Sequence, residues 1–308
     1  NGNFLGNLFD SITTIQWTLG DGTIRNALPS LGTNNQLDSI HHLYAQAGIY
    51  TTYLYVENQG YCSGIDTVRV IVSPAVIPTA TAPYLEDFNA TDGGWFEESE
   101  DGNQSSGLWA WSNESPPRIS ATTKVWVTKP NTTYGPDTSG WVYSPCFDLT
   151  QLSRPMIKLD YYNDTDVGND GVVIEYYERT TDKWIPLGDV GRGINWYNQA
   201  VIGGRPGEQT LAPRGWSGAN TSWKDGRYKL DDFSTYDDFR FRIAFGAIKV
   251  TNTPFEGFAF DNVWIGNRTR NVLLEHFSNK EVPSFDPINQ HVYNLIYTTP
   301  LFKDVVLV

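Results

Sequence analysis

Apolar and polar residues alternate over short stretches in the first quarter of the chain. In the segment 50–56 the even-numbered positions hold Tyr, Thr, Leu and Val, which places these side chains on one face of an extended strand. The segment 67–72 repeats the alternation after an Asn-Gln-Gly turn at 58–60. A Leu-Gly-Asp-Gly turn at 19–22 precedes both, with glycines that accept positive φ. The pattern predicts an antiparallel β-sandwich over the first 73 residues.

Prolines and small residues interrupt this alternation at 74–83. Pro74, Pro78 and Pro83 lie among alanine, threonine, valine and isoleucine, without a strand period. Proline fixes φ and favours extended backbone, so the composition predicts a stiff linker. The residues before it, 1–73, therefore form a domain of their own.

Longer and more aromatic strands are predicted from residue 84 to residue 268. Alternating segments occur at 156–162, 171–177, 239–245 and 257–265, and helical periodicity is almost absent. Many short strands separated by turn-rich loops are typical of a two-sheet jelly roll. The fold class predicted for the chain is mainly β, with a small sandwich followed by a larger one.

The period of the pattern changes over residues 269–308. A strand is predicted at 271–277 and a second one at 304–308. Between them, Asp286 and Pro287 suit the N-cap and first position of a helix. One β-α-β unit cannot cover both faces of its own sheet, so we expect this domain to be incomplete within these residues.

Residues 1–73 resemble the PKD domain. The family pattern Trp-x-Phe-Gly-Asp-Gly appears at 17–22 as Trp-Thr-Leu-Gly-Asp-Gly, with Leu19 in the aromatic slot. A second motif, His-Leu-Tyr-Ala-Gln-Ala-Gly-Ile-Tyr, follows at 42–50 with the separation that the family has. PKD domains are small β-sandwiches of bacterial surface proteins and secreted hydrolases. The resemblance implies a spacer or binding module rather than a catalytic domain.

Residues 84–268 resemble the MAM-like and cleaved-adhesin jelly rolls of bacterial surface proteins. Matching pieces occur in the expected order, among them Leu-Glu-Asp-Phe at 85–88, Trp-Val-Tyr-Ser-Pro-Cys-Phe-Asp-Leu at 141–149 and Phe-Asp-Asn-Val at 260–263. The resemblance implies binding or adhesion, with structural calcium in many members. The tail resembles the opening of a thioredoxin-like domain. Its segment 278–285 contains no cysteine, which excludes disulfide exchange there because the thiolate is the nucleophile.

Charge and composition narrow the classes of partner. The 22 Lys and Arg against 35 Asp and Glu give a net charge of −13, which disfavours duplex nucleic acid. Aromatic residues make up 14% of the chain, against one Met and two Cys, a balance typical of extracellular β-proteins. Cys62 and Cys146 lie in different predicted domains, so we expect each to be a small buried residue rather than half of a disulfide. No apolar run approaches the roughly 20 residues that span a bilayer, so membrane insertion is not expected.

Motifs that would carry catalysis are missing from the sequence. It contains no His-Glu-x-x-His, no phosphate-binding loop and no Gly-x-Ser-x-Gly elbow. Gly-Trp-Ser-Gly at 215–218 lacks the strand-turn-helix context that a nucleophile turn requires. We therefore expect no catalytic residue in this chain.

One group of candidate calcium ligands lies in the loop after residue 163. Asp164, Asp166 and Asp170 alternate around a glycine. Carboxylates at this spacing can surround one Ca2+, which takes six to eight oxygen ligands. The alternative is an acidic, solvated loop between two strands, since Asn and Asp are also selected for turn geometry.

A second group combines the beginning and the end of the jelly roll. Glu86 and Asp87 lie near its first strand, and Asp261 lies near its last. By resemblance to related jelly rolls, calcium is expected where those two strands meet. The alternative is that Asp261 only caps a turn.

Tryptophan is the candidate for ligand contact, because ten of the eleven fall between residues 95 and 264. Trp and Tyr rings stack on the C–H faces of sugars, as adhesive jelly rolls use them. The alternative is core packing, since a large aromatic side chain buries about 150–250 Å2. The candidates, chosen from loop-rich sequence, are Trp109, Trp111, Trp126, Trp196, Trp216 and Trp223.

These features predict a non-catalytic stalk and adhesion region of a large secreted or cell-surface bacterial protein. The module order resembles proteins exported by type IX secretion in gliding bacteria, which implies a motility adhesin at the cell surface. The expected partners are a glycan or matrix ligand and, transiently, the secretion machinery. The alternative is an accessory binding region of a secreted protease or polysaccharide hydrolase whose catalytic domain lies elsewhere. A purely structural spacer is the third possibility.

Overall fold

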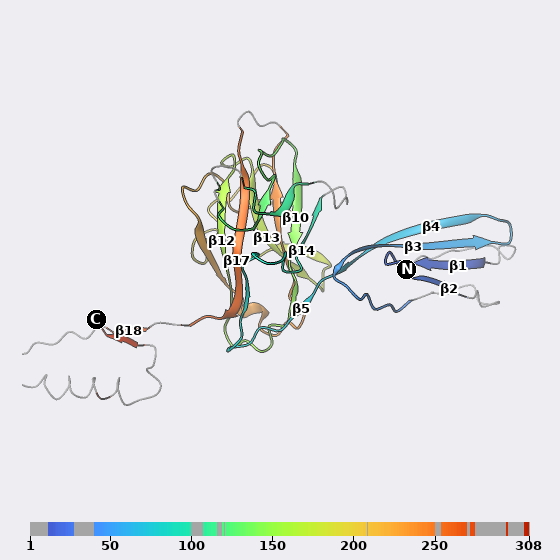
Figure 1. Cartoon of the computed structure of the whole chain (residues 1–308), viewed down its shortest axis with the longest axis horizontal. Helices are drawn as coiled ribbons and strands as arrows, with labels where there is room; N and C mark the ends of the chain where they lie inside the picture. The colour runs from blue at the N-terminus through green and yellow to red at the C-terminus, as the bar shows by residue number, and fades with distance from the viewer. Residues whose placement is uncertain are drawn as a thin grey trace, which may run out of the picture. The chain divides into compact units, whose positions relative to one another are not determined.

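The structure of the chain is a computed structural model that describes residues 12–27, 40–99, 107–115, 119, 121–207, 209–249, 254–269, 272–274, 294 and 305–307. Figure 1 shows strands as its main elements, which confirms the predicted mainly-β class. Within the described ranges, no helix is both long and apolar enough to cross a membrane.

The first sandwich contributes one described antiparallel sheet with strand order β2-β1-β3-β4. Its strands are β1 (Ile12–Thr18), β2 (Ile24–Ala27), β3 (Gly48–Asn58) and β4 (Ser63–Val72). The predicted turn at 19–22 closes with a hydrogen bond from the Leu19 N–H to the Thr23 carbonyl at 2.9 Å. Gly20 adopts φ +79° there, and a Cβ on it would lie 2.8 Å from the Thr51 carbonyl oxygen. The turn therefore needs glycine for its conformation and for its close approach to β3.

The predicted linker begins with a strand. β5 (Ala75–Val76) pairs in parallel with β11 (Cys146–Phe147) of the jelly roll. Pro74 accepts a hydrogen bond from the Cys146 N–H at 2.7 Å, and Val76 accepts one from the Asp148 N–H at 2.9 Å. Proline lacks an N–H but keeps its carbonyl, so a proline-flanked segment still pairs at a sheet edge.

The larger domain consists of two sheets, as predicted for a jelly roll. One sheet has five strands in the order β14-β13-β16-β10-β7, and the other has the order β15-β12-β17-β9-β8 with β6 also paired to β17. Neighbours in each sheet are mostly distant in sequence. The elements are β6 (Tyr84–Glu86), β7 (Phe96–Ser99), β8 (Trp109–Ser112), β9 (Val125–Thr128), β10 (Ser139–Tyr143), β12 (Pro155–Asp164), β13 (Gly171–Glu178), β14 (Lys183–Pro186), β15 (Lys224–Lys229), the 3-10 turn η1 (Asp231–Phe233), β16 (Phe241–Gly246) and β17 (Gly257–Asn267).

Aromatic side chains fill the core between these two sheets. Trp216 is 1% exposed and packs edge-on against Trp196, with ring centroids 5.1 Å apart, and stacks against Phe258 at 5.8 Å. Edge-to-face and offset pairs of this kind add about 0.5–1.5 kcal/mol each beyond their area burial. The abundance of tryptophan in the sequence is therefore largely a property of the core.

The C-terminal unit, Asn267–Val308, is separate from the rest of the chain. Its described strands are β18 (Val272–Leu274) and β19 (Val305–Leu307), which pair in parallel as a β-α-β unit requires. The helix predicted from Asp286 lies outside the described residues. The thioredoxin-like assignment stays a prediction.

Candidate functional site

Four of the six tryptophans expected at the surface are core side chains. Trp109, Trp126, Trp196 and Trp216 are between 1% and 5% exposed and belong to the main core cluster. Three of them donate their indole N–H to backbone carbonyls, Trp109 to Gly140, Trp196 to Leu187 and Trp216 to Asn195. The expectation that these four offer open ring faces is corrected: polar neighbours in sequence did not prevent their rings from pointing inward.

Trp111 and Trp223 are half-buried and each is already covered on one side. The Trp111 indole N–H donates to the Phe88 carbonyl at 2.8 Å, and the Lys124 ammonium lies 3.7 Å from the centre of its ring. The Trp223 indole N–H donates to the Ile119 carbonyl at 3.2 Å. Neither side chain belongs to a larger cluster of exposed rings.

Aromatic residues gather on the outer side of the five-stranded sheet, most of them partly exposed and one, Tyr143, buried at 5% exposure. Strand pairing sets Phe96 of β7 opposite Tyr143 of β10, and Tyr143 opposite Arg242 of β16. The alternate residues of β10 and β16, such as Val142 and Ile243, are fully buried between the sheets. We call this surface the aromatic face and define it by five residues: Phe96, Trp141, Tyr143, Tyr177 and Trp184.

The rings of the aromatic face touch one another across the sheet. Phe96 stacks on Tyr143 with centroids 5.2 Å apart, and Tyr143 lies 5.5 Å from Trp184. Trp184 in turn lies 5.4 Å from Tyr177, its register partner on β13. The contacts produce a continuous apolar surface that crosses from the β7 edge to the β14 edge.

A buried ion pair lies beneath these rings. The Arg242 guanidinium is 4.4 Å from the ring centres of both Trp141 and Trp184. Its Nε and Nη2 donate to Glu175 Oε2 at 2.9 and 2.8 Å, and the two side chains are 1% and 0% exposed. The pair thus links strands β10, β16, β13 and β14 and fixes the orientation of both indole rings.

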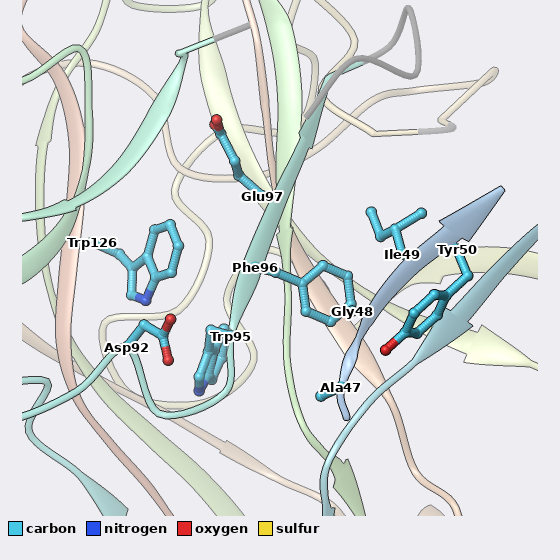
Figure 2. A pocket seen from close by; sticks show the side chains of 9 residues that line it. All are labelled: Ala47, Gly48, Ile49, Tyr50, Asp92, Trp95, Phe96, Glu97 and Trp126. Atoms are coloured by element: carbon cyan, nitrogen blue, oxygen red, sulfur yellow. The ribbon is translucent and has the colours of Figure 1, made fainter. Parts of the chain in front are cut away.

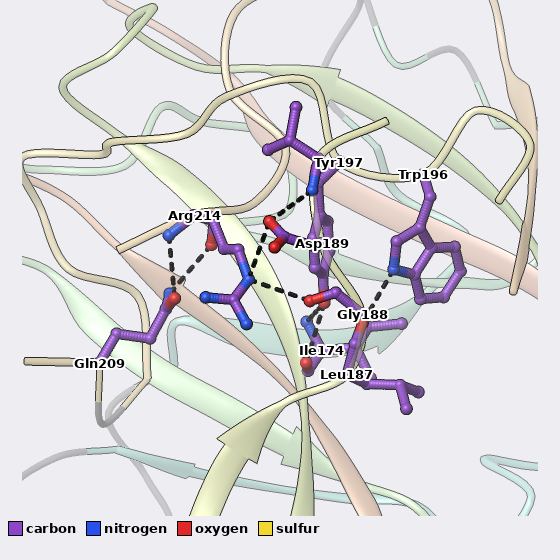
Figure 3. Close-up of polar contacts among 9 residues, drawn as sticks. Ile174, Leu187, Gly188, Asp189, Trp196, Tyr197, Gln209 and Arg214 are labelled. Atoms are coloured by element: carbon purple, nitrogen blue, oxygen red, sulfur yellow. Dashed lines mark hydrogen bonds and ion pairs between the residues drawn. The ribbon is translucent and has the colours of Figure 1, made fainter. Parts of the chain in front are cut away.

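A hydrogen-bonded loop supports the β14 edge of this surface (Figure 3). Trp196 donates its indole N–H to the carbonyl of Leu187, the residue that follows β14, at 2.9 Å. Arg214 Nε donates to the Gly188 carbonyl at 2.9 Å, and Gln209 bonds both the N–H and the carbonyl of Arg214. These bonds hold the end of β14, and with it the backbone that carries Trp184.

The sequence contains a signal for this surface that our choice of candidates did not use. Trp141 and Tyr143 are two residues apart in one strand and therefore point to the same side. Trp184 and Tyr177 come together only through the pairing of β13 with β14. A search for aromatic residues of equal parity in neighbouring strands would have selected them instead of the loop tryptophans.

A hollow of about 450 Å3 adjoins the β7 end of the aromatic face (Figure 2). Phe96 belongs to both, and the other walls include the segment from Ala47 to Tyr50. Glu97 lines it too, and its Oε2 accepts the backbone N–H of Trp109 at 2.9 Å. The hollow therefore shares Phe96 with the aromatic face but is lined by two carboxylates as well, those of Asp92 and Glu97.

The first carboxylate group is split among separate protein partners. Asp170 is fully buried and accepts hydrogen bonds from the Tyr134 hydroxyl at 2.7 Å and the Ile248 N–H at 2.8 Å. Asp164, 3% exposed, accepts the Glu256 N–H at 3.0 Å. Asp166 accepts from the Asn169 amide at 2.9 Å. Asp164 and Asp170 are buried, and each accepts a hydrogen bond from a backbone N–H of a distant segment. This argues against the alternative that they only form a solvated loop.

The strands that carry the second carboxylate group lie side by side. β6 pairs with β17 so that Glu86 lies opposite Val263, two residues from Asp261. Burial, together with the carboxylates of Asp160, Asp87 and Glu86, raises the pKa of Asp261 from 3.8 to about 6, against the effect of a hydrogen bond from the Asn262 N–H.

Oxygen donors alone make up this second group, which suits a hard cation such as Ca2+ by chemistry. As arranged, however, no three His, Cys, Asp or Glu side chains in the described part of the chain lie together closely enough to hold a metal ion. Calcium binding would require Glu86, Asp87 and Asp261 to turn toward one another. Calcium therefore stays a prediction.

Comparison with known proteins gives distant structural similarity. No protein-family profile and no curated protein matches the chain. A solved structure of carbohydrate-binding modules from the β-sandwich superfamily is 11% identical, with 82% of this chain and 85% of that chain covered and a TM-score of 0.33. The K1 cleaved adhesin domain of Lys-gingipain from Porphyromonas gingivalis is 11% identical, with 61% and 99% covered and a TM-score of 0.34. The enzymatically active domain of tailspike protein 4 from bacteriophage CBA120 is 11% identical, with 58% and 20% covered and a TM-score of 0.29.

Proposed function

We propose that this chain is a non-catalytic binding region and that the aromatic face of its jelly roll binds glycan. The observation that carries the proposal is the run of touching rings from Phe96 to Tyr177 on one side of one sheet, all partly exposed except the buried Tyr143. Pyranose sugars present C–H faces that stack on Trp and Tyr rings, and ligand sites in general combine aromatic walls with a few polar groups. Trp95, Trp109, Trp126, Trp196 and Trp216 are buried in the core and are unavailable for this role.

Polar groups at the margins of the aromatic face suit sugar hydroxyls. Glu98 is buried beside Trp141, accepts its indole N–H at 3.3 Å and pairs with Arg69, so it holds the Trp141 ring rather than a ligand. Asp182 accepts the hydroxyl of Tyr177, and the Arg240 guanidinium lies 4.4 Å from the centre of the same ring. Carboxylates and guanidinium groups at the rim of an apolar platform can orient a ligand that stacks on it.

The finer role that we assign is a stalk and adhesion region of a secreted or cell-surface bacterial protein. Its support is the sequence: the PKD motifs at 17–22 and 42–50 and the cleaved-adhesin pieces at 85–88 and 260–263. In the most specific form of the proposal, the parent protein is a gliding-motility adhesin exported by type IX secretion. The secretion machinery is then a transient partner.

An accessory region of a secreted protease or polysaccharide hydrolase is the second candidate function. The same aromatic face would then hold the parent enzyme on its substrate. A catalytic motif in the sequence flanking these 308 residues supports this candidate, whereas further tandem β-domains support the adhesin.

Calcium is part of the proposal at the junction of β6 and β17. Glu86, Asp87 and Asp261 are the residues that would hold it, with Asp160 next to them. A bound cation would neutralise the carboxylates that raise the pKa of Asp261 and would fasten the first strand of the domain to the last.

The test is a glycan and matrix-protein array probed with the 308-residue chain, with calcium and with chelator. We expect glycan signals that Trp184→Ala lowers by about tenfold or more, the cost of losing one buried contact at the centre of a site. Trp264→Ala is the matched control, because this half-buried tryptophan lies on β17 of the other sheet. Signals that fall equally in both variants, or no signal at all, would exclude the aromatic face as the glycan site.

A further inference from the structure

We infer that the ligand of the aromatic face is an uncharged pyranose polymer, bound by stacking and hydroxyl hydrogen bonds rather than by recognition of a carboxylate or sulfate group. The inference rests on the proposed function and specifies its substrate class. Arginine beside tryptophan is a common arrangement for holding anions. The distribution of charge over the aromatic face argues against an anionic ligand here.

The Arg242 guanidinium, at the centre of the face, already contacts one carboxylate and two indole rings. Its Nε and Nη2 both point to Glu175 Oε2, at 2.9 and 2.8 Å. Its guanidinium carbon also lies 4.4 Å from the ring centres of both Trp141 and Trp184. With 1% of its side chain exposed and a carboxylate beside it, this cation presents no donor to an anionic ligand.

The charged groups of the face leave no net positive charge, because Arg240 offsets Asp182 and the other four form two ion pairs. Glu98 pairs with Arg69, and Glu175 pairs with Arg242, so these two carboxylates and two cations cancel. Asp182 accepts the Tyr177 hydroxyl and carries a further negative charge. Arg240 is the remaining cation of the face, and the contact described for it there is with the ring of Tyr177 rather than with a carboxylate.

One partly exposed cation, on the same tyrosine as Asp182, is a weak anchor for a polyanion. A polyanion that contacted the face would gain one unpaired guanidinium while approaching a chain with a net charge of −13. The negative charges of the chain and of the polyanion repel each other, which weakens association and slows the encounter. A neutral chain of pyranose rings meets none of this repulsion and can use the whole aromatic surface, so the geometry favours the neutral polymer.

The experiment compares neutral polymers (mannan, xylan, dextran) with anionic ones (alginate, polygalacturonate, dextran sulfate) by affinity electrophoresis of the 308-residue chain. We expect retardation by at least one neutral polymer, with an affinity that changes less than about twofold between ~0.05 M and ~0.5 M NaCl, because no ion pair contributes. Trp184→Ala removes that retardation, whereas Trp264→Ala, on β17 of the other sheet, changes it less than about twofold.

Two results separate the inference from the function on which it rests. Binding to anionic polymers alone, weakened by salt and by Arg240→Gln, would overturn the neutral-ligand inference and leave glycan binding by the aromatic face intact. Retardation by none of the six polymers, or retardation that Trp184→Ala leaves unchanged, would overturn both. Thermal unfolding of each variant, with Trp184→Tyr as a milder substitution, shows whether a lost signal reflects the surface or the fold.

Discussion

At the scale of single residues, the Arg242–Glu175 pair has the most consequence for the site. Two opposite charges with almost no exposure lie under two tryptophans that a ligand would touch. The sequence provides alternating aromatic residues in each strand but not this pairing, since Glu175 and Arg242 are far apart in the chain. The inward or outward direction of each tryptophan likewise follows from strand parity, which loop-rich neighbours such as those of Trp109 obscured.

Removing one member of this pair should destabilise the jelly roll strongly. We expect Arg242→Ala to lower the free energy of unfolding by about 3–5 kcal/mol, because it leaves the buried Glu175 carboxylate without its partner. The double variant Arg242→Met with Glu175→Leu should recover most of this loss, since it buries no charge. Urea unfolding followed by tryptophan fluorescence measures both. A double variant as unstable as the single one would contradict the assignment of a buried, mutually dependent pair.

Asp261 should make stability depend on pH between about 4 and 6 in metal-free buffer. Its pKa is raised to about 6 in the folded chain from 3.8, so the folded state binds the extra proton over this window. The contribution of Asp261 to the free energy of unfolding is therefore greatest below pH 4. It decreases as pH rises toward 6, by about 1–2 kcal/mol once solvent screening is allowed for.

Asp261→Asn tests this dependence, because the amide cannot ionise. The variant should be more stable than the wild type at pH 7 and should lose the component of the pH dependence between 4 and 6. Unfolding temperatures measured across this range in chelator give the comparison. Parallel pH profiles for the two proteins would show that Asp261 titrates with an ordinary pKa.

At the scale of elements, the sequence predicted strand positions well and strand partners poorly. The segments predicted at 156–162 and 171–177 lie within β12 and β13, because alternation reports which face of a strand is buried. The pairing of β5 with β11, inside a predicted linker, carries no such signal in a two-residue strand. The pairing partners of each strand are set by the packing of the whole sandwich, so a local sequence pattern does not predict them.

The turn between β1 and β2 offers a test with an internal control. Gly20 and Gly22 both have positive φ, at 79° and 89°, but only a Cβ on Gly20 meets another backbone, whereas nothing lies within 4 Å of one on Gly22. We expect Gly22→Ala to cost about 1 kcal/mol for strained backbone and Gly20→Ala to cost more. Amide hydrogen exchange in β1 and β3 measures the difference. Equal effects of the two substitutions would contradict the close approach to Thr51.

The β6–β17 junction gives the prediction for calcium. If Glu86, Asp87 and Asp261 bind the ion, adding it at about 100 times its dissociation constant should stabilise the wild type by about 2.7 kcal/mol and chelator should reverse this. Asp261→Asn should abolish the gain, whereas Asp237→Asn, which removes an exposed carboxylate elsewhere, should keep it. Identical unfolding temperatures of the wild type with and without calcium would remove the ion from the proposal.

At the scale of the whole molecule, the chain combines a small sandwich, a jelly roll and a separate C-terminal unit. Alternation and motif order predicted the mainly-β class and the two-sheet jelly roll. Of the binding site, only the residue type was predicted, because which tryptophans are exposed depends on the packing of two sheets against each other. The central claim is that the outer side of one of those sheets, the aromatic face, is the binding surface.

Titration calorimetry of the polysaccharide selected by the array tests this claim most directly. The proteins compared are the wild type, the double variant Trp141→Ala with Trp184→Ala, and the control Trp264→Ala on the other sheet. We predict that the wild type and the control bind with the same affinity and that the double variant, still folded by circular dichroism, gives no binding heat. Equal affinity of all three proteins would contradict the account.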